Sequence, residues 1–171
     1  REGRLSVNDA VLVQVAVPSR EDAAGYADIR REVEETVGRI NGQFSEAGKV
    51  AVHYFRRTLG REELVAHYLV ADAMLVTPLR DGMNLVAKEY VCSRADLGGV
   101  LVLSEFAGAA RELRRALLVN PRDVDALKNV IVQAIKMPAA DRRMRMAILR
   151  TQVKRHDVFE WAEAFLGELK A

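Results

Sequence analysis

The chain has 171 residues, of which 50% are hydrophobic and 29% are charged, and its formal net charge is +2. This length suits one domain with a buried core, and the composition excludes a disordered chain. The charge is nearly balanced and no basic cluster is interleaved with aromatic residues, which argues against a nucleic-acid partner.

Strand and helix patterns alternate along the chain. Short apolar runs predict buried parallel strands at residues 11–17, 50–55, 73–76, 100–103 and 117–119. Apolar repeats of three or four residues predict helices at 21–41, 61–71, 85–94, 123–137 and 139–155, and a last one after 157. Right-handed crossovers then place helices on both faces of one parallel sheet, which is an α/β fold.

The helix boundaries and buried faces follow from the same pattern. We expect Ser19 or Asp22 to cap the first helix and Gly42 to end it. We expect an arginine-rich face of the fifth helix to be solvated, with Arg142, Arg143 and Arg145. Residues expected to face inward are Tyr26, Ile29, Val33, Val37, Ile40, Leu64, Val65, Tyr68, Leu69, Val124, Leu127, Val130, Ile131 and Ala134, with Phe159, Trp161 and Phe165 packing in a core or an interface.

The segment from Val76 to Val91 joins a strand to a helix and is the candidate active site. Pro78 ends the strand because it lacks an amide donor, and Gly82 is expected to allow a tight or left-handed turn. Asn84 is well suited to cap the helix that follows. Ligands of open α/β sheets bind outside the carboxyl ends of the strands, where free helix amides favour phosphate.

Glu89 lies about one turn beyond those amides, on the same helix face as Leu85 and Val86. A pyrophosphate at the amides would leave its ribose near Glu89. On the pattern alone, however, the plainer interpretation is favoured, in which Glu89 is a solvated helix residue and Asp81 an ordinary turn residue.

The residues from Val76 to Val91, with Val102–Ala110 and Val119-Asn120-Pro121, resemble the trehalose-6-phosphate synthase family of retaining glycosyltransferases. Pro18-Ser19-Arg20 and the run 38–42 match earlier blocks of the family in the same order. The resemblance covers nearly the whole chain and implies the Rossmann-like C-terminal domain of a two-domain enzyme.

This resemblance also implies a domain organisation. The chain starts without methionine, which suggests a cut at a domain boundary. The resemblance implies that the first domain is missing, together with the opening strand of the second domain and its basic pair for the donor phosphates. We expect residues 1–157 to form the nucleotide-sugar-binding domain without its first strand. Residues 158–171 are expected to form a helix that packs toward the absent domain.

The implied activity is transfer of glucose, with retention, from a nucleotide-glucose to glucose 6-phosphate, which gives trehalose 6-phosphate. The resemblance implies that Asp81 holds hydroxyls of the donor glucose, that amides from Met83 to Val86 contact glucose and diphosphate, and that Glu89 binds the ribose. Arg20 is implied to contact the acceptor phosphate. The full implied donor-binding set is Leu59, Gly82, Met83, Asn84, Leu85, Val86, Ala87, Lys88 and Glu89.

Other properties implied by the resemblance are less specific. The family often has an aromatic residue where this chain has Leu59, at a backbone contact to the donor base, so UDP, ADP and GDP all stay open as carriers. No cofactor and no metal are implied, and we expect the complete protein to be a homo-oligomer. The fragment by itself is expected to have no turnover.

Two alternative functions stay open. Another two-domain glycosyltransferase, or a glycogen-phosphorylase-like enzyme, would keep the role of Glu89 but use a different acceptor, and Arg20 with the Gly82-Met83-Asn84 turn argues against it. A non-catalytic regulatory subunit that binds nucleotide sugars is the other alternative. The presence of both Asp81 and Glu89 argues against that function.

The cysteine content and the length of the apolar runs indicate the cellular compartment. Cys92 is the only cysteine, so no internal disulfide can form, and His53, His67 and His156 lack metal-ligand spacing. No apolar run approaches the roughly 18 residues of a membrane span, and the charged start does not resemble a signal peptide. We therefore expect a cytoplasmic protein that binds neither a membrane nor a metal.

Overall fold

The computed structural model describes residues 3–18 and 25–169 of the chain. These form two compact units, Arg1–Arg61 and Glu62–Ala171. The described residues do not include Ser19, Arg20 and Asp22. The structure therefore does not describe the expected cap of the first helix or the expected acceptor contact.

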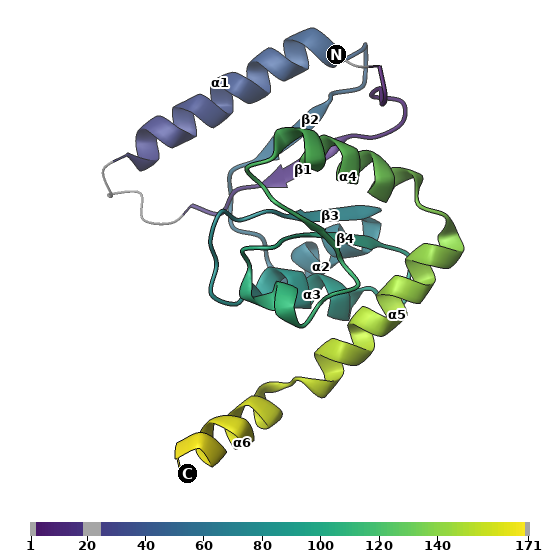
Figure 1. Ribbon diagram of the computed structural model, residues 1–171. Coiled ribbons are helices and arrows are strands. Elements are labelled where there is room, and N and C mark those ends of the chain that lie inside the picture. The colour runs from purple at the N-terminus through teal and green to yellow at the C-terminus, as the bar shows by residue number, and fades with distance from the viewer. Residues whose placement is uncertain (1–2, 19–24, 170–171) are drawn as a thin grey trace. The chain divides into compact units, whose positions relative to one another are not determined.

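The first unit contains two parallel strands and the helix that connects them. Strand β1 (Leu12–Val15) pairs with β2 (Val52–Phe55), and α1 (Tyr26–Phe44) lies between them in the sequence (Figure 1). Asn41 joins α1 to β2, because its side chain donates to the carbonyl of Val52 at 2.9 Å and accepts from the Val52 N–H at 2.8 Å. One asparagine thus satisfies both backbone groups of a strand residue.

The second unit contains a three-stranded parallel sheet with β4 in its centre. Its strands are β3 (Ala73–Val76), β4 (Val100–Ser104) and β5 (Leu117–Val119). Its helices are α2 (Arg61–Val70), α3 (Leu85–Ser93), a short 3-10 helix at Gly108–Arg111, α4 (Val124–Lys136), α5 (Ala139–Arg155) and α6 (Val158–Leu169).

Helices cover both faces of this sheet, as Figure 1 shows with α4 on one side of β3 and β4 and with α2 and α3 on the other. All five residues of β4 are buried, and successive side chains point to opposite faces. Leu101 and Leu103 pack in one core cluster with residues of α2, α3 and α5, whereas Val100 and Val102 pack in another with residues of α4 and β5. The predicted α/β fold with parallel strands is confirmed.

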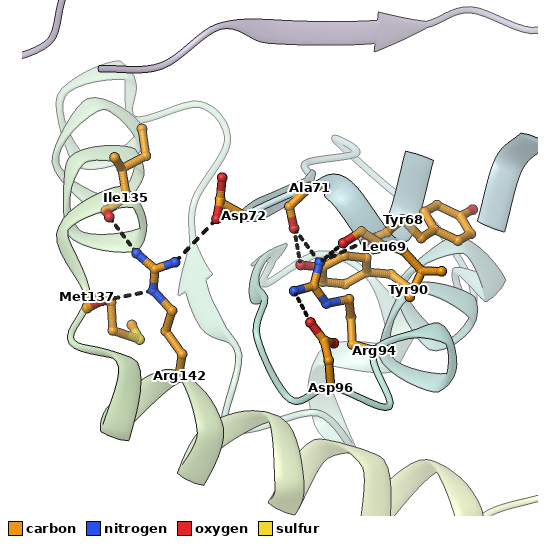
Figure 2. Close-up of polar contacts among 10 residues, drawn as sticks. All are labelled: Tyr68, Leu69, Ala71, Asp72, Tyr90, Arg94, Asp96, Ile135, Met137 and Arg142. Carbon is orange, nitrogen blue, oxygen red and sulfur yellow. Dashed lines mark hydrogen bonds and ion pairs between the residues drawn. The ribbon is translucent and has the colours of Figure 1, made fainter. Parts of the chain in front are cut away.

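Three arginines cap the carboxyl ends of helices in the second unit. Arg94 donates to carbonyls at the end of α2, and Arg150 donates to the carbonyls of Val91 and Cys92 near the end of α3. Arg142 donates to the carbonyls of Ile135 and Met137 at the end of α4, both at 2.8 Å (Figure 2). The last carbonyls of a helix have no partner within it, so these guanidinium groups bind acceptors that would otherwise be unsatisfied.

Four predictions of local structure are wrong. The strands form two separate sheets in place of one, because an apolar strand pattern does not encode which strand will be its neighbour. Gly42 does not end the first helix, which continues to Phe44. A helical glycine costs only about 1 kcal/mol relative to alanine, and the bonds between Asn41 and Val52 hold this end of the helix in place. Arg142 is not solvated, since it caps α4, whereas Arg143 is exposed as expected.

The fourth error concerns helix faces. Four side chains expected to face inward are exposed, namely Tyr26, Ile29, Leu69 and Val124. They lie in the first or last turn of their helices, where neighbouring elements cover a helix least. Phe159 and Phe165 on α6 are also exposed, which the predicted core or interface packing leaves open. The side chain of Trp161 lies outside the described set. The predicted domain boundary after residue 157 stays a prediction.

Candidate active site

The candidate site lies where β3 and β4 end, because both strands run in parallel and their carboxyl ends share one edge of the sheet. The turn after β3 is tied to the loop after β4 by backbone hydrogen bonds. The amide of Asp81 donates to the carbonyl of Phe106 at 3.3 Å, and the amide of Gly108 donates to the carbonyl of Asp81 at 3.0 Å. A third bond runs from the amide of Ala109 to the carbonyl of Met83 at 2.8 Å. The turn is therefore held in one position.

Gly108 allows this close approach. A Cβ atom at position 108 would lie 2.0 Å from the carbonyl oxygen of Gly82 and 3.2 Å from the Cα of Met83. No side chain fits there, so residue 108 has to be glycine for the two loops to meet. The sequence analysis assigned no role to Gly108. The signal that could have found it is a glycine between two alanines directly after a buried strand.

The side chains of Asp81 and Asn84 form hydrogen bonds within the turn. The Asp81 carboxylate accepts from the Met83 amide at 3.1 Å and from the Asn84 side-chain amide at 3.0 Å. Asn84 caps α3 as predicted, because its side-chain oxygen accepts from the Ala87 amide at 2.9 Å. Gly82 was predicted to allow a tight or left-handed turn, and the residue of the turn with left-handed φ is Asn84, at 76°. Asparagine tolerates this conformation because its short side chain bonds locally.

The start of α3 offers backbone donors at the protein surface. Leu85 and Val86 stand in the first turn, where amides have no acceptor within the helix. The first turn of α3 carries no acidic side chain, and the Asp81 carboxylate in the turn before it is bound to the Met83 amide and the Asn84 side chain. The side chains of Met83, Leu85 and Val86 are exposed. This helix end therefore suits a phosphate group.

Two members of the predicted donor-binding set are engaged within the protein. Ala87 has a buried side chain, and its amide is bound to Asn84. Lys88 forms an ion pair with Glu112 at 2.7 Å, and only 16% of its side chain is exposed. Their structural contribution is to hold the inner face of α3 against the core and the segment after the 3-10 helix.

Glu89 is exposed, on the same side of α3 as Leu85 and Val86, as the spacing predicts. Its carboxylate Oε2 accepts a hydrogen bond from the hydroxyl of Tyr68 on α2 at 3.1 Å. Burial, followed by this hydrogen bond, raises the pKa of Tyr68 to about 12. The structure thus adds Tyr68 to the site, whereas the sequence suggested only a core residue.

The remaining predicted residues, Leu59 and Arg20, belong to the segment of the chain that makes up the first unit. Leu59 follows β2 in the first unit and is half-buried. A hollow of about 210 Å³ in that unit is bounded by Pro18 and by Tyr26 at the start of α1, with Arg30 and Arg56 also lining it. Arg20 belongs to the segment between Pro18 and α1, and its predicted role stays untested.

Two further kinds of feature are absent from residues 3–18 and 25–169. No group of three or more His, Cys, Asp or Glu side chains in these ranges is arranged to hold a metal ion. In the same part of the chain, no helix is long and apolar enough to cross a membrane.

Comparison with known proteins places this geometry in context. The model of glycosyltransferase family 20 matches residues 2–171. A trehalose-6-phosphate synthase of Mycobacterium leprae is 55% identical over 168 residues, which make up 98% of this chain and 34% of the relative. The chain therefore spans about a third of the length of the curated relatives it matches.

Solved structures agree with the fold. An α,α-trehalose-phosphate synthase (UDP-forming) of Burkholderia xenovorans, in complex with glucose-6-phosphate, is 44% identical with a TM-score of 0.89, covering 94% of this chain and 36% of that one. A protein from E. coli bound with UDP-2-fluoro glucose is 43% identical, again with a TM-score of 0.89, covering 94% of this chain and 36% of that one.

Proposed function

Because the chain belongs to glycosyltransferase family 20, we propose that it is the donor-binding part of a retaining glucosyltransferase. The complete protein transfers glucose from a nucleotide-glucose to glucose 6-phosphate and forms trehalose 6-phosphate. Relatives that are trehalose-6-phosphate synthases support this proposal, as do similar structures that hold glucose-6-phosphate and UDP-2-fluoro glucose. The observation that carries it is the open start of α3, held beside Asp81 with Glu89 one turn farther on.

The backbone amides of the turn stabilise the leaving group. In the proposed reaction the bond between C1 of glucose and the diphosphate oxygen breaks, and a bond from C1 to the acceptor oxygen forms on the same face. The acceptor hydroxyl passes its proton to the leaving phosphate. Negative charge grows on that phosphate, and the amides of Leu85 and Val86 face it without rearranging, because the turn is already tied to the next loop.

Asp81 has two tasks in this proposal. A carboxylate offers about four acceptor positions, and the turn uses two of them for Met83 and Asn84. The others accept hydroxyls of the donor glucose. Replacing Asp81 with alanine therefore loosens the turn and removes a sugar contact together.

Glu89 binds the ribose. Its exposed carboxylate lies on the same helix face as the free amides, about one turn away. Two carboxylate oxygens accept from two neighbouring hydroxyls, which is the pattern that a ribose diol presents.

Arg20 and Leu59 are the residues proposed for the acceptor and base contacts. Arg20 is proposed to bind the phosphate of glucose 6-phosphate, since a guanidinium fork matches phosphate oxygens. The backbone of Leu59 is proposed to contact the donor base. UDP is the carrier proposed first, supported by the UDP ligand of the E. coli structure and the UDP-forming enzyme of Burkholderia. A cytoplasmic homo-oligomer that needs no metal is the proposed working form.

The proposal is tested with the complete protein and glucose donors that carry uridine, adenosine or guanosine diphosphate. Release of nucleoside diphosphate and formation of trehalose 6-phosphate are measured together. We expect both products in equal amounts, and we expect Asp81→Ala and Glu89→Ala to lower kcat/KM for the donor. Arg20→Ala should chiefly raise the KM for glucose 6-phosphate. Nucleotide binding without any sugar product, from every donor, would refute the enzymatic function and favour a regulatory subunit.

A further inference from the structure

Tyr68 links the buried surface of α2 to an exposed carboxylate of α3. The tyrosine is only 4% exposed, whereas Glu89 is an exposed residue. The hydroxyl of Tyr68 donates to Oε2 of Glu89 at 3.1 Å. Among the described residues, this is the one hydrogen bond to the Glu89 carboxylate, so Oε1 and the second acceptor position of Oε2 are left to a ligand.

Tyr68, which donates this hydrogen bond, is held both by its backbone and by its ring. Figure 2 shows the backbone carbonyl of Tyr68 turned toward the Arg94 guanidinium, which donates to it at 3.1 Å, while the tyrosine ring extends away. That ring packs edge-on against the ring of Tyr90, with centroids 6.1 Å apart and planes at 77°. Tyr90 is fully buried and its own hydroxyl donates to the carbonyl of Ala71 at 3.2 Å. The Tyr68 hydroxyl therefore projects from a rigid support.

We propose that Tyr68 is a positioning residue for donor recognition, which orients the Glu89 carboxylate so that it accepts the ribose hydroxyls of a nucleoside diphosphate sugar. This inference rests on the proposed function of Glu89. A glutamate at the surface samples several rotamers. Binding of a ligand that requires one of these rotamers therefore carries the entropy cost of ordering the side chain. The Tyr68 hydroxyl selects one carboxylate orientation in advance.

Tyr68→Phe in the complete protein is the direct test, because it removes the hydroxyl and keeps the ring. We expect the KM for UDP-glucose to rise about 3- to 10-fold, as for loss of one ordinary hydrogen bond, because the effect reaches the ligand only through Glu89, with kcat changed less than about twofold. Binding of UDP and of 2′-deoxy-UDP is then compared by calorimetry. The preference for UDP should fall by a similar factor, which a general loss of packing would not produce.

Tyr90→Phe is the matched control. It removes a buried hydroxyl from the partner ring, but that hydroxyl binds the backbone of Ala71 and not Glu89. We expect it to lower the melting temperature and to leave the preference for UDP over 2′-deoxy-UDP unchanged. Glu89→Ala should abolish that preference, and adding Tyr68→Phe to Glu89→Ala should change it no further.

The outcomes separate the two proposals. If Glu89→Ala reduces the ribose preference but Tyr68→Phe does not, the positioning role is overturned and the ribose contact of Glu89 stands. If Glu89→Ala leaves the preference intact, the ribose contact fails and Tyr68 has no group to act through. An equal effect of Tyr68→Phe with and without Glu89 also overturns the inference, because the tyrosine would then act by another route.

Discussion

The guanidinium of Arg94 lies against the end of α2, with its Nη1 atom 2.6 Å from the carbonyl oxygen of Leu69. The same nitrogen donates to two further carbonyls, and Nη2 pairs with Asp96 at 2.8 Å (Figure 2). Arg94 directly follows α3, so a single buried side chain joins the helix that carries Tyr68 to the helix that carries Glu89.

Arg94→Met should destabilise this junction. The substitution keeps much of the apolar stem but leaves three carbonyls and Asp96 without the buried donor, which costs roughly 2 to 4 kcal/mol. Hydrogen exchange of the amides of α2 and α3 in the complete protein measures the free energy of local opening. Arg143→Met is the control on exposed α5 surface, expected within about 0.5 kcal/mol of the parent. Equal protection in both variants would show that the cap contributes nothing.

Gly108→Ala should impair the reaction more than the fold. Its Cβ would meet the Gly82 carbonyl at 2.0 Å, so the turn that presents the α3 amides has to move. Because small displacements of positioning groups lower rates strongly, we expect kcat/KM for the donor to fall roughly 10- to 100-fold. Steady-state kinetics with UDP-glucose checks this. Parent-like kinetics would mean that the contact between the loops is not needed.

Gly42→Ala should stabilise the protein. Gly42 lies inside α1, and nothing lies within 4 Å of a Cβ built there. Alanine in a helix interior is favoured over glycine by about 0.5 to 1 kcal/mol. Urea unfolding, monitored through the hydrogen-exchange protection of the α1 amides, measures the change in the free energy of unfolding. A loss of stability would instead indicate that the helix ends at Gly42, as the sequence predicts.

Alkaline pH should weaken the second unit. Burial raises the pKa values of Tyr68 and Tyr90 from 10.0 to about 12 in the folded protein. Between these values the unfolded tyrosines lose protons that the folded ones keep. The stabilisation is thus complete below about pH 10 and is lost as the pH rises toward 12. Unfolding measured across this range should show a falling free energy, with a shallower slope in Tyr68→Phe and Tyr90→Phe. Equal slopes in all three proteins would contradict the assignment.

The sequence by itself determined the elements and the strand-to-helix turn that forms the candidate site. The predicted bounds of β3, β5 and α5 match the structure, and Asn84 caps α3 as predicted. These features depend on local physics: apolar periodicity, a proline that cannot donate, and an asparagine next to a free amide. The position of Asp81 and Glu89 around the start of one helix also follows from their spacing in the sequence.

Tertiary structure decided which distant residues meet. The packing of Gly108 against Gly82, the caps formed by Arg94 and Arg142, and the bond from Tyr68 to Glu89 each join separate elements. The division of the strands into two sheets is of the same kind. A local pattern specifies how a segment folds and which side it buries, but hydrogen bonds between segments depend on how the backbone brings them together. For that reason Arg142 was expected in solvent and Tyr68 only in the core.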